Sequence, residues 1–246
     1  MKLYGLIGNP LGHSFSKKYF TEKFEKEQLK DCSFELYPLK QIQDLTKLLK
    51  DIIDLHGLAV TIPYKESVIP FLDSIDKEAS IIGAVNCIQI TAGTLTGYNT
   101  DLIGFEKSLL PLLKPHHTKA LVLGSGGSSK AVQYVLRKLG IGFLVVTRNE
   151  DPAEGFIQYN SIDQNLVEQS TLIINCSPVG MYPRIDEKPA IPYRYLSNKH
   201  LLFDLIYRPE QTKFLEEGLK MGATVKNGYE MLVIQAEENW KIWNVK

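Results

Sequence analysis

A glycine-rich loop is the clearest chemical motif in the sequence. Residues 121–131 read LVLGSGGSSKA, so Gly124 and Gly126 follow an apolar run and precede an amphipathic segment. Glycines here permit a sharp turn and a close approach of the main chain to a pyrophosphate, which the N-terminus of a helix attracts. A tight strand-to-helix turn alone is the other interpretation. Because the flanks have the expected strand and helix patterns, we favour a dinucleotide-binding loop.

The end of the next expected strand bears on which dinucleotide binds. Enzymes that use NAD generally carry Asp or Glu there to bind the ribose hydroxyls, whereas this strand ends in Thr147 and Arg148. A guanidinium can pair with a 2′-phosphate through two hydrogen bonds. Arg148 could also be an ordinary solvated loop residue. The pattern favours NADP over NAD.

A second group of polar residues follows expected strands nearer the N-terminus. Ser14 and Ser16 come after a Gly and Pro turn, and their hydroxyls could hold a carboxylate, although one of them could simply cap the next helix. Lys65 follows a strand that ends at a proline, and Asp101 ends a further segment. A lysine and a carboxylate can handle the proton of a substrate hydroxyl while hydride leaves the carbon. A lysine at such a place can equally be a surface charge.

The hydrophobic pattern predicts a sheet that would position these residues. Short apolar runs alternate with segments of helical spacing, which predicts parallel crossovers and an α/β fold. We expect two domains, a substrate domain at 1–103 and a Rossmann-like dinucleotide domain at 104–226, with a terminal helix at 227–246 that packs back on the first. The expected strands are 3–8, 33–39, 57–63, 85–91, 94–98, 120–123, 143–147, 171–175, 201–205 and 224–226, and the expected helices are 15–28, 42–53, 101–113, 130–139 and 162–169.

Composition excludes several classes of protein. The 246 residues carry 28 basic and 28 acidic side chains, so there is no net positive field to hold nucleic acid or anionic lipid. No apolar run is long enough to cross a bilayer. Three widely spaced cysteines without a CxxC pair argue against a disulfide framework or a metal site. We expect a cytoplasmic protein that binds a small molecule and acts as a monomer or homodimer.

Taken together, eight ordered segments resemble the shikimate dehydrogenase family over nearly the whole chain. That family is similar in its two-domain α/β architecture. The resemblance implies reversible, NADP-linked oxidation of shikimate to 3-dehydroshikimate, a step on the route to chorismate and the aromatic amino acids. The segments are GNPLGHSFS at 8–16, VTIPYK at 60–65, IGAVN at 82–86, GYNTD at 97–101, GSGGSSKA at 124–131, NCSPVGM at 175–181, DLIYRPEQTKFL at 204–215 and NGYEMLVIQA at 227–236.

The resemblance also implies roles for particular residues. Lys65 and Asp101 would be the catalytic pair. The residues implied to bind the ring carboxylate and hydroxyls are Ser14, Ser16, Thr61, Asn86, Tyr207 and Gln235. Those implied to bind the cofactor are Gly124, Ser125, Gly126 and Gly127 at the pyrophosphate, Thr147 and Arg148 at the adenosine end, and Gly228 near the nicotinamide.

The chain departs from the family pattern in places, and other functions remain open. Lys17 to Thr21 replace the usual Pro and the later His and Asn, which puts the position of the first helix in doubt. Cys87 and Cys176 replace other small residues, and we interpret both as packing thiols. A quinate/shikimate dehydrogenase that uses NAD is the alternative enzyme, although no acid stands at Thr147. A dinucleotide sensor without catalysis is a further alternative, but it would not need Lys65 and Asp101.

Overall fold

The computed structural model describes residues 1–12, 14–149 and 154–245. His13, within the segment 8–16, therefore lies outside the described residues. Contacts between residues divide the chain into two compact units, and we call residues 1–100 with 236–246 unit 1 and residues 101–235 unit 2. The α/β class expected from the sequence is confirmed. The domain boundaries expected at 103/104 and 226/227 stay predictions.

Unit 1 is built on a mixed sheet of six strands in the order β2-β1-β3-β5-β6-β4. Strands β1, β2 and β3 are parallel, and the predicted hairpin of β5 and β6 makes β5 antiparallel to both of its neighbours. The strands are β1 (Lys2–Gly8), β2 (Cys32–Pro38), β3 (Leu55–Val60), β4 (Ser74–Ile75), β5 (Cys87–Thr91) and β6 (Thr94–Tyr98), and the helices are α1 (Phe15–Lys26), α2 (Asp44–Asp51), α3 (Lys77–Ile82) and the short 3-10 turn η1 (Ile69–Phe71).

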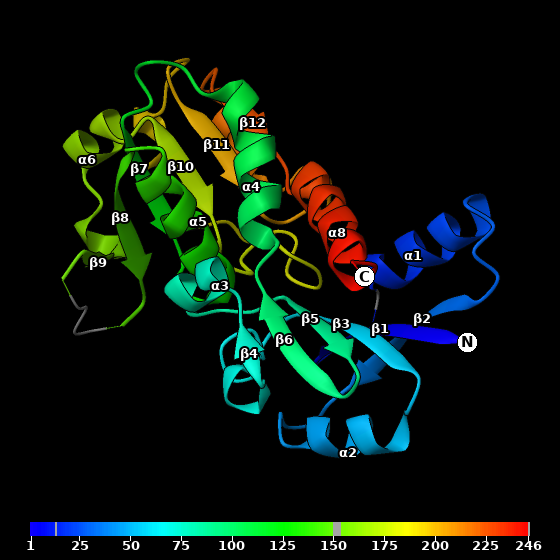
Figure 1. Cartoon of the computed structure of the whole chain (residues 1–246). Helices are drawn as coiled ribbons and strands as arrows, with labels where there is room; N and C mark the ends of the chain where they lie inside the picture. The colour runs from blue at the N-terminus through cyan, green and yellow to red at the C-terminus, as the bar shows by residue number, and fades with distance from the viewer. Residues whose placement is uncertain (13, 150–153, 246) are drawn as a thin grey trace. The chain divides into compact units, whose positions relative to one another are not determined.

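The two faces of this sheet bury different kinds of side chain. On one face, aliphatic residues such as Leu45 of α2 and Leu58 of β3 are fully buried. On the other, an aromatic cluster joins α1 to the sheet, and Phe20 stacks on Phe34 with ring centroids 4.7 Å apart. Figure 1 shows α1 and α2 on these opposite faces. Successive strand residues point to opposite faces, which explains why alternate positions enter the two layers.

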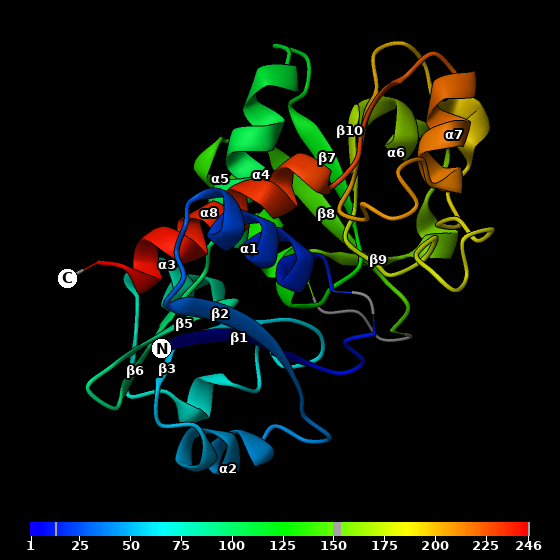
Figure 2. The same cartoon turned by 90° about the vertical axis from the view of Figure 1, so that its right-hand side faces the viewer.

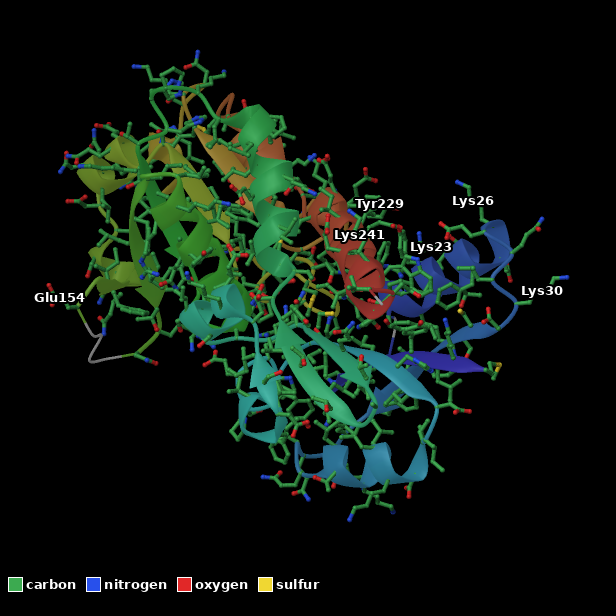
Figure 3. All side chains as sticks on the ribbon, in the orientation of Figure 1. Lys23, Lys26, Lys30, Glu154, Tyr229 and Lys241 are labelled. Atoms are coloured by element: carbon green, nitrogen blue, oxygen red, sulfur yellow. The ribbon has the colours of Figure 1, made fainter. Side chains whose placement is uncertain are left out.

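The departure at Lys17 to Thr21 is accommodated by this aromatic cluster. Phe20 is fully buried, and the Tyr19 hydroxyl donates a hydrogen bond to Glu237 in the C-terminal part of α8 (Tyr229–Trp243). The amine of Lys23, labelled in Figure 3, also pairs with Glu237 at 3.0 Å. Together these bonds hold α1 against the end of α8.

The last turns of α8 pack on the sheet of unit 1. The indole N–H of Trp243 donates to the carbonyl of Ile88 at 3.0 Å, and the Gln89 amide donates to the carbonyl of Ile242 at 2.6 Å. Gly57 faces the Trp243 ring so closely that a Cβ there would lie 2.3 Å from it. The absence of a side chain at Gly57 therefore lets the indole lie on β3.

Unit 2 contains a parallel sheet of six strands in the order β12-β11-β10-β7-β8-β9. Figure 2 shows α4 and α5 on one side of it and α6 and α7 on the other. This is the arrangement of a Rossmann-like fold. The strands are β7 (Lys119–Leu123), β8 (Gly142–Thr147), β9 (Phe156–Gln158), β10 (Leu172–Asn175), β11 (Leu201–Asp204) and β12 (Thr224–Lys226), and the helices are α4 (Asp101–Leu109), η2 (Leu110–Leu112), α5 (Gly127–Lys138), η3 (Tyr159–Ser161), α6 (Gln164–Gln169), η4 (Tyr193–Tyr195), α7 (Lys213–Lys220) and the first part of α8.

Several short elements were not expected from the sequence. Strands β4 and β9 and helix α3 have two, three and six residues, too few to show a period. Helix α7 carries Gly218 in its interior, a residue that weakens helix propensity. Gly218 faces Leu202 of β11, where a Cβ would lie 2.6 Å from that side chain, so close packing on the sheet explains the glycine.

His117 should make the stability of the protein sensitive to acid. Its Nδ1 accepts a hydrogen bond from the Lys114 N–H at 3.0 Å, which requires the neutral ring, and burial lowers its pKa below the ordinary value of 6.5. As the pH falls below about 7, His117 is therefore protonated more readily in the unfolded chain than in the folded protein, and this lowers the free energy of unfolding. We expect the urea midpoint to fall between about pH 7 and pH 5 in the wild type. The fall should be smaller in His117→Gln, while His56→Gln in unit 1 should keep it, and an unchanged pH dependence in His117→Gln would contradict this assignment.

No helix among the described residues has the length and apolarity needed to span a membrane.

Candidate functional site

The predicted substrate residues of unit 1 follow strands that end at one edge of its sheet. The turn after β1 and the turn after β3 are joined, because the Asn9 N–H donates to the carbonyl of Ile62 at 3.0 Å. A Cβ at Gly8 would lie 2.4 Å from the methyl group of Thr61. The segments that carry Ser14, Ser16, Thr61 and Lys65 therefore start side by side.

Ser14 has a structural role at the start of α1. Its Oγ accepts a hydrogen bond from the Lys17 N–H at 3.4 Å, so it is the N-cap of the helix. Ser16, 9% exposed, lies in the first turn. A hydroxyl that accepts a backbone hydrogen bond still has its own hydrogen to donate. The capping interpretation thus applies to Ser14 and is compatible with binding of a carboxylate.

Hydrogen bonds of the main chain and of the Asn86 side chain link Lys65 to the segment before Asp101. The Val85 N–H donates to the carbonyl of Lys65 at 2.7 Å. The next residue, Asn86, accepts from the Thr100 N–H at 2.6 Å and donates its amide to the Thr100 hydroxyl at 3.0 Å. Asp101 follows Thr100 directly in the chain. These hydrogen bonds therefore connect the loop that carries Lys65 to Thr100, the residue before Asp101.

The side chain of Asn86 is buried and hydrogen-bonded within the protein. It is 2% exposed, and both ends of its amide bond to Thr100. The Thr100 hydroxyl in turn donates to Asn239 Oδ1 at 2.6 Å. Asn86 therefore holds Thr100, the residue before Asp101, in place. Its role in binding substrate stays a prediction.

In unit 2, the helix that begins at Asp101 packs against α8 beside the predicted substrate residue Gln235. Asp101 is the first residue of α4, and Gly104 is one turn further along that helix. A Cβ at Gly104 would lie 2.6 Å from the carbonyl of Met231 and 3.3 Å from the Cβ of Gln235. Only a glycine lets α4 and α8 approach this closely, so the first turn of α4 packs on the part of α8 that carries Met231 and Gln235.

The glycine loop has the geometry of an anion-binding turn. Gly124 follows β7 with φ +112°, a conformation that favours glycine, and a Cβ there would lie 3.1 Å from the Ser177 N–H group. Gly126 is the N-cap of α5, which has no side-chain cap, and a Cβ on Gly126 would meet no atom within 4 Å. The loop therefore fits a pyrophosphate on the helix N-terminus. Ser125, which is exposed, and Gly127 complete it.

Arg148 borders an open pocket at the carboxyl end of β8. The pocket has a volume of about 300 Å³. Gln158 donates from its amide to the carbonyl of Asn149 at 3.1 Å, which ties β9 to the Arg148 loop. Burial raises the pKa of Tyr159, and the charge of Arg148 opposes that rise, so the two side chains interact. The described residues that line it are Thr147, Arg148, Gln158, Tyr159 and Asn160.

Sequence reasoning missed Gln158, Tyr159 and Asn160. These residues come about ten positions after Arg148, and nothing in their types marks a binding site. They reach the pocket because β9 pairs in parallel with β8, with Gln158 opposite Thr147. Only the order of the strands places them there.

Tyr207 and Gly228 lie beyond the ends of β11 and β12. Gly228 donates its N–H to the carbonyl of Ile206 at 3.1 Å, and a Cβ on it would lie 2.1 Å from the carbonyl of Leu205. No larger residue fits there without movement of the main chain. Tyr207 is half-buried in the same loop.

Cys87 and Cys176, which stand where the family has other small residues, have thiols of low reactivity. Burial raises the pKa of Cys87 and of Cys176 well above the ordinary value, and Asp204 and Asp101 raise that of Cys176 further. A raised pKa keeps the thiol protonated. Among residues 1–12, 14–149 and 154–245, no group of three His, Cys, Asp or Glu could hold a metal ion.

Comparison with known proteins places this arrangement among oxidoreductases. Residues 6–88 match the family model of the shikimate dehydrogenase substrate binding domain. The chain is 36% identical to a shikimate dehydrogenase (NADP+) of Methanococcus maripaludis, over 98% of this chain and 91% of that protein. The structure of shikimate dehydrogenase from Aquifex aeolicus superposes with a TM-score of 0.88 at 31% identity, covering 99% of this chain and 92% of that one. A complex of the Thermus thermophilus enzyme with NADP(H) and shikimate gives 0.87 at 30% identity, over 99% and 94%.

Proposed function

We propose that this chain, which belongs to the shikimate dehydrogenase family, catalyses the reversible oxidation of shikimate to 3-dehydroshikimate with NADP. The observation that carries the proposal is the match, over 98% of the chain, to relatives named shikimate dehydrogenase (NADP+). The Thermus thermophilus structure holds both NADP(H) and shikimate in the same fold. The product of this reaction is an intermediate on the route to chorismate and the aromatic amino acids.

The proposed chemistry removes a hydride from a ring carbon and a proton from its hydroxyl oxygen. NADP supplies the hydride acceptor when it is bound. We assign the proton to Lys65, with Asp101 as the carboxylate of the same acid–base pair. In the reverse direction the ammonium of Lys65 returns the proton to the carbonyl oxygen as hydride adds to the carbon. The hydrogen bonds that run from Lys65 through Val85 and Asn86 to Thr100 support the assignment, because Thr100 directly precedes Asp101 in the chain.

The remaining predicted residues are proposed to hold the two ligands. Ser14, Ser16 and Tyr207 are assigned to the carboxylate of shikimate. The residues assigned to its hydroxyls are Thr61, Asn86 and Gln235, and those assigned to NADP are Gly124, Ser125, Gly126, Gly127, Thr147, Arg148 and Gly228. The uncapped start of α5 and the position of Arg148 at a pocket after β8 support the cofactor assignment.

Removal of both serine hydroxyls should weaken shikimate binding selectively. A hydrogen bond to a charged group contributes about 1.5 to 3 kcal/mol, so Ser14→Ala with Ser16→Ala should raise the KM for shikimate at least about tenfold. The Kd of NADPH should change little, because the serines lie in unit 1 and the predicted cofactor loop lies in unit 2. Initial rates and NADPH fluorescence measure the two quantities.

The control for this pair is a double variant of the same unit, Ser33→Ala with Ser74→Ala. Since Ser14 caps α1, circular dichroism must show that the serine variant is folded. An unchanged KM for shikimate in the folded variant would move the carboxylate site elsewhere.

The substrate itself can be tested against quinate, which has one more ring hydroxyl and lacks the ring double bond. The purified protein is given shikimate or quinate with NADP, and NADPH formation is followed by near-ultraviolet absorbance. We expect the higher kcat/KM with shikimate. Faster turnover of quinate would favour the quinate/shikimate enzyme, and no turnover of either acid would favour a sensor.

The location and assembly of the protein are also proposals. We propose a cytoplasmic enzyme that acts as a monomer or a homodimer on a small-molecule substrate, without nucleic acid or membrane as partner. The balanced charge of 28 basic and 28 acidic residues supports this. Size-exclusion chromatography with light scattering measures the assembly state.

A further inference from the structure

Asp204 is a buried carboxylate that the proposed reaction leaves without a role. It ends β11, is 0% exposed, and accepts three hydrogen bonds. The donors are the Asn175 amide at 3.0 Å, the Ile206 N–H at 3.0 Å and the Thr212 hydroxyl at 2.6 Å. A buried carboxylate is costly unless such partners surround it. The three donors belong to three different segments, so one side chain joins the end of β10, the loop after β11 and the start of α7.

The first of these bonds leads to the glycine loop. Asn175 Oδ1 accepts from the Ser177 N–H at 3.1 Å and from its hydroxyl at 2.7 Å, which orders the turn after β10. That turn packs against Gly124, where a Cβ would lie 3.1 Å from Ser177 N and 3.2 Å from the carbonyl carbon of Cys176. Through Asn175, Asp204 thus holds the turn at Cys176 and Ser177, which packs against Gly124 of the predicted pyrophosphate loop.

The second bond leads to Gly228. Ile206 gives its N–H to Asp204, and its carbonyl accepts from the Gly228 N–H at 3.1 Å. Tyr207 is the next residue of this loop. The loop that Asp204 fixes therefore carries Tyr207 and contacts Gly228, both of which are predicted to bind ligand.

The third bond anchors the other end of the same loop. Thr212 is the N-cap of α7, and its Oγ accepts from the Leu215 N–H at 3.4 Å while its hydroxyl hydrogen goes to Asp204. The segment between Ile206 and Thr212 is thereby held at both ends by one carboxylate.

We infer that Asp204 is a positioning residue for NADP: it aligns the turn behind Gly124 and the loop beside Gly228, and its hydrogen bonds set the affinity for the cofactor. The inference rests on the proposed function. Asp204 touches neither ligand in this account and acts only through Asn175, Ile206 and Thr212.

The test compares cofactor affinity with fold stability. Asp204→Asn keeps the size of the side chain but replaces an acceptor oxygen by a donor, so one of the three donors loses its partner. We expect the Kd of NADPH to rise about tenfold or more. It is measured by NADPH fluorescence without shikimate, well below the unfolding temperature. A purely structural role would lower the unfolding temperature and leave this Kd unchanged.

A second pair of variants keeps the test decisive if Asp204→Asn does not fold. Thr212→Val removes the hydroxyl at nearly constant volume and should raise the Kd, whereas Thr212→Ser keeps the hydroxyl and should restore the wild-type value. The matched control is Asp163→Asn, since Asp163 caps α6 of the same unit through Leu166 N at 2.8 Å and is exposed. Its Kd for NADPH should equal that of the wild type.

The outcomes separate this inference from the function on which it rests. Wild-type affinity for NADPH in folded Asp204→Asn and Thr212→Val would overturn the positioning role and leave the proposed function intact. Failure of Thr212→Ser to restore the Kd would also overturn it. A wild-type protein that does not bind NADPH would contradict the proposed function itself.

Discussion

Substitution of Lys65 by alanine is expected to lower kcat for shikimate about 10²- to 10⁴-fold, which is the usual contribution of general acid–base catalysis. Hydride can leave the carbon only as the hydroxyl proton is removed, and Lys65 is the group assigned to that proton. Most of the NADPH affinity should remain, because the predicted cofactor residues lie in unit 2 and Lys65 lies in unit 1. Steady-state kinetics at saturating shikimate and NADP measure the effect.

The prediction for Lys65→Ala is checked with a control variant and a double variant. Lys77→Ala removes an exposed lysine of the same unit and should leave kcat unchanged. Since Lys65 and Asp101 would serve one proton, the double variant with Asp101→Ala should lose much less than the product of the two single losses. Normal turnover by Lys65→Ala, or strictly multiplicative losses, would show that the proton leaves by another route.

Arg148→Ala is expected to weaken NADP binding about 10- to 100-fold while it changes NAD binding little. A charge-assisted hydrogen bond to the 2′-phosphate contributes about 1.5 to 3 kcal/mol, and NAD lacks that phosphate. Competition of each dinucleotide with bound NADPH, followed by fluorescence, gives both constants.

The matched control for Arg148 is Arg137→Ala. Arg137 is an exposed arginine in the last turn of α5, and its guanidinium lies over the ring of Phe143. Removing it changes the charge of unit 2 by the same amount and should leave both constants unchanged. Equal losses for NADP and NAD in Arg148→Ala would exclude recognition of the 2′-phosphate by this residue.

The sequence predicted those parts of the fold and site that depend on local pattern. Val122 of β7 and Ile173 of β10 lie in apolar runs buried within a parallel sheet, and such runs are visible without a structure. Lys65 and Arg148 are predicted as site residues because polar residues that follow such runs lie at a strand end, and their roles stay predictions. The turn at Gly124 is predictable because the glycine spacing reflects a backbone requirement, which the positive φ of Gly124 confirms.

What could not be predicted depends on which strands are neighbours. Tyr159 reaches the Arg148 pocket only because β9 pairs with β8, and Asp204 meets Asn175 only because β11 pairs with β10 in a register that places them opposite each other. Residue types near these positions carry no signal for either contact. The cap formed by Ser14 was predicted as one of two alternatives, and the structure assigns it to Ser14 and not to Ser16.

The most direct test of the account is the initial rate of the purified wild-type protein with shikimate, measured with NADP and then with NAD at the same concentration. Near-ultraviolet absorbance reports the reduced cofactor in both cases. The account predicts shikimate-dependent reduction of NADP and a clearly lower rate with NAD, because Arg148, which lines the pocket after β8, is assigned to the 2′-phosphate. An absence of reduction with both cofactors, or a rate with NAD equal to or above that with NADP, would contradict it.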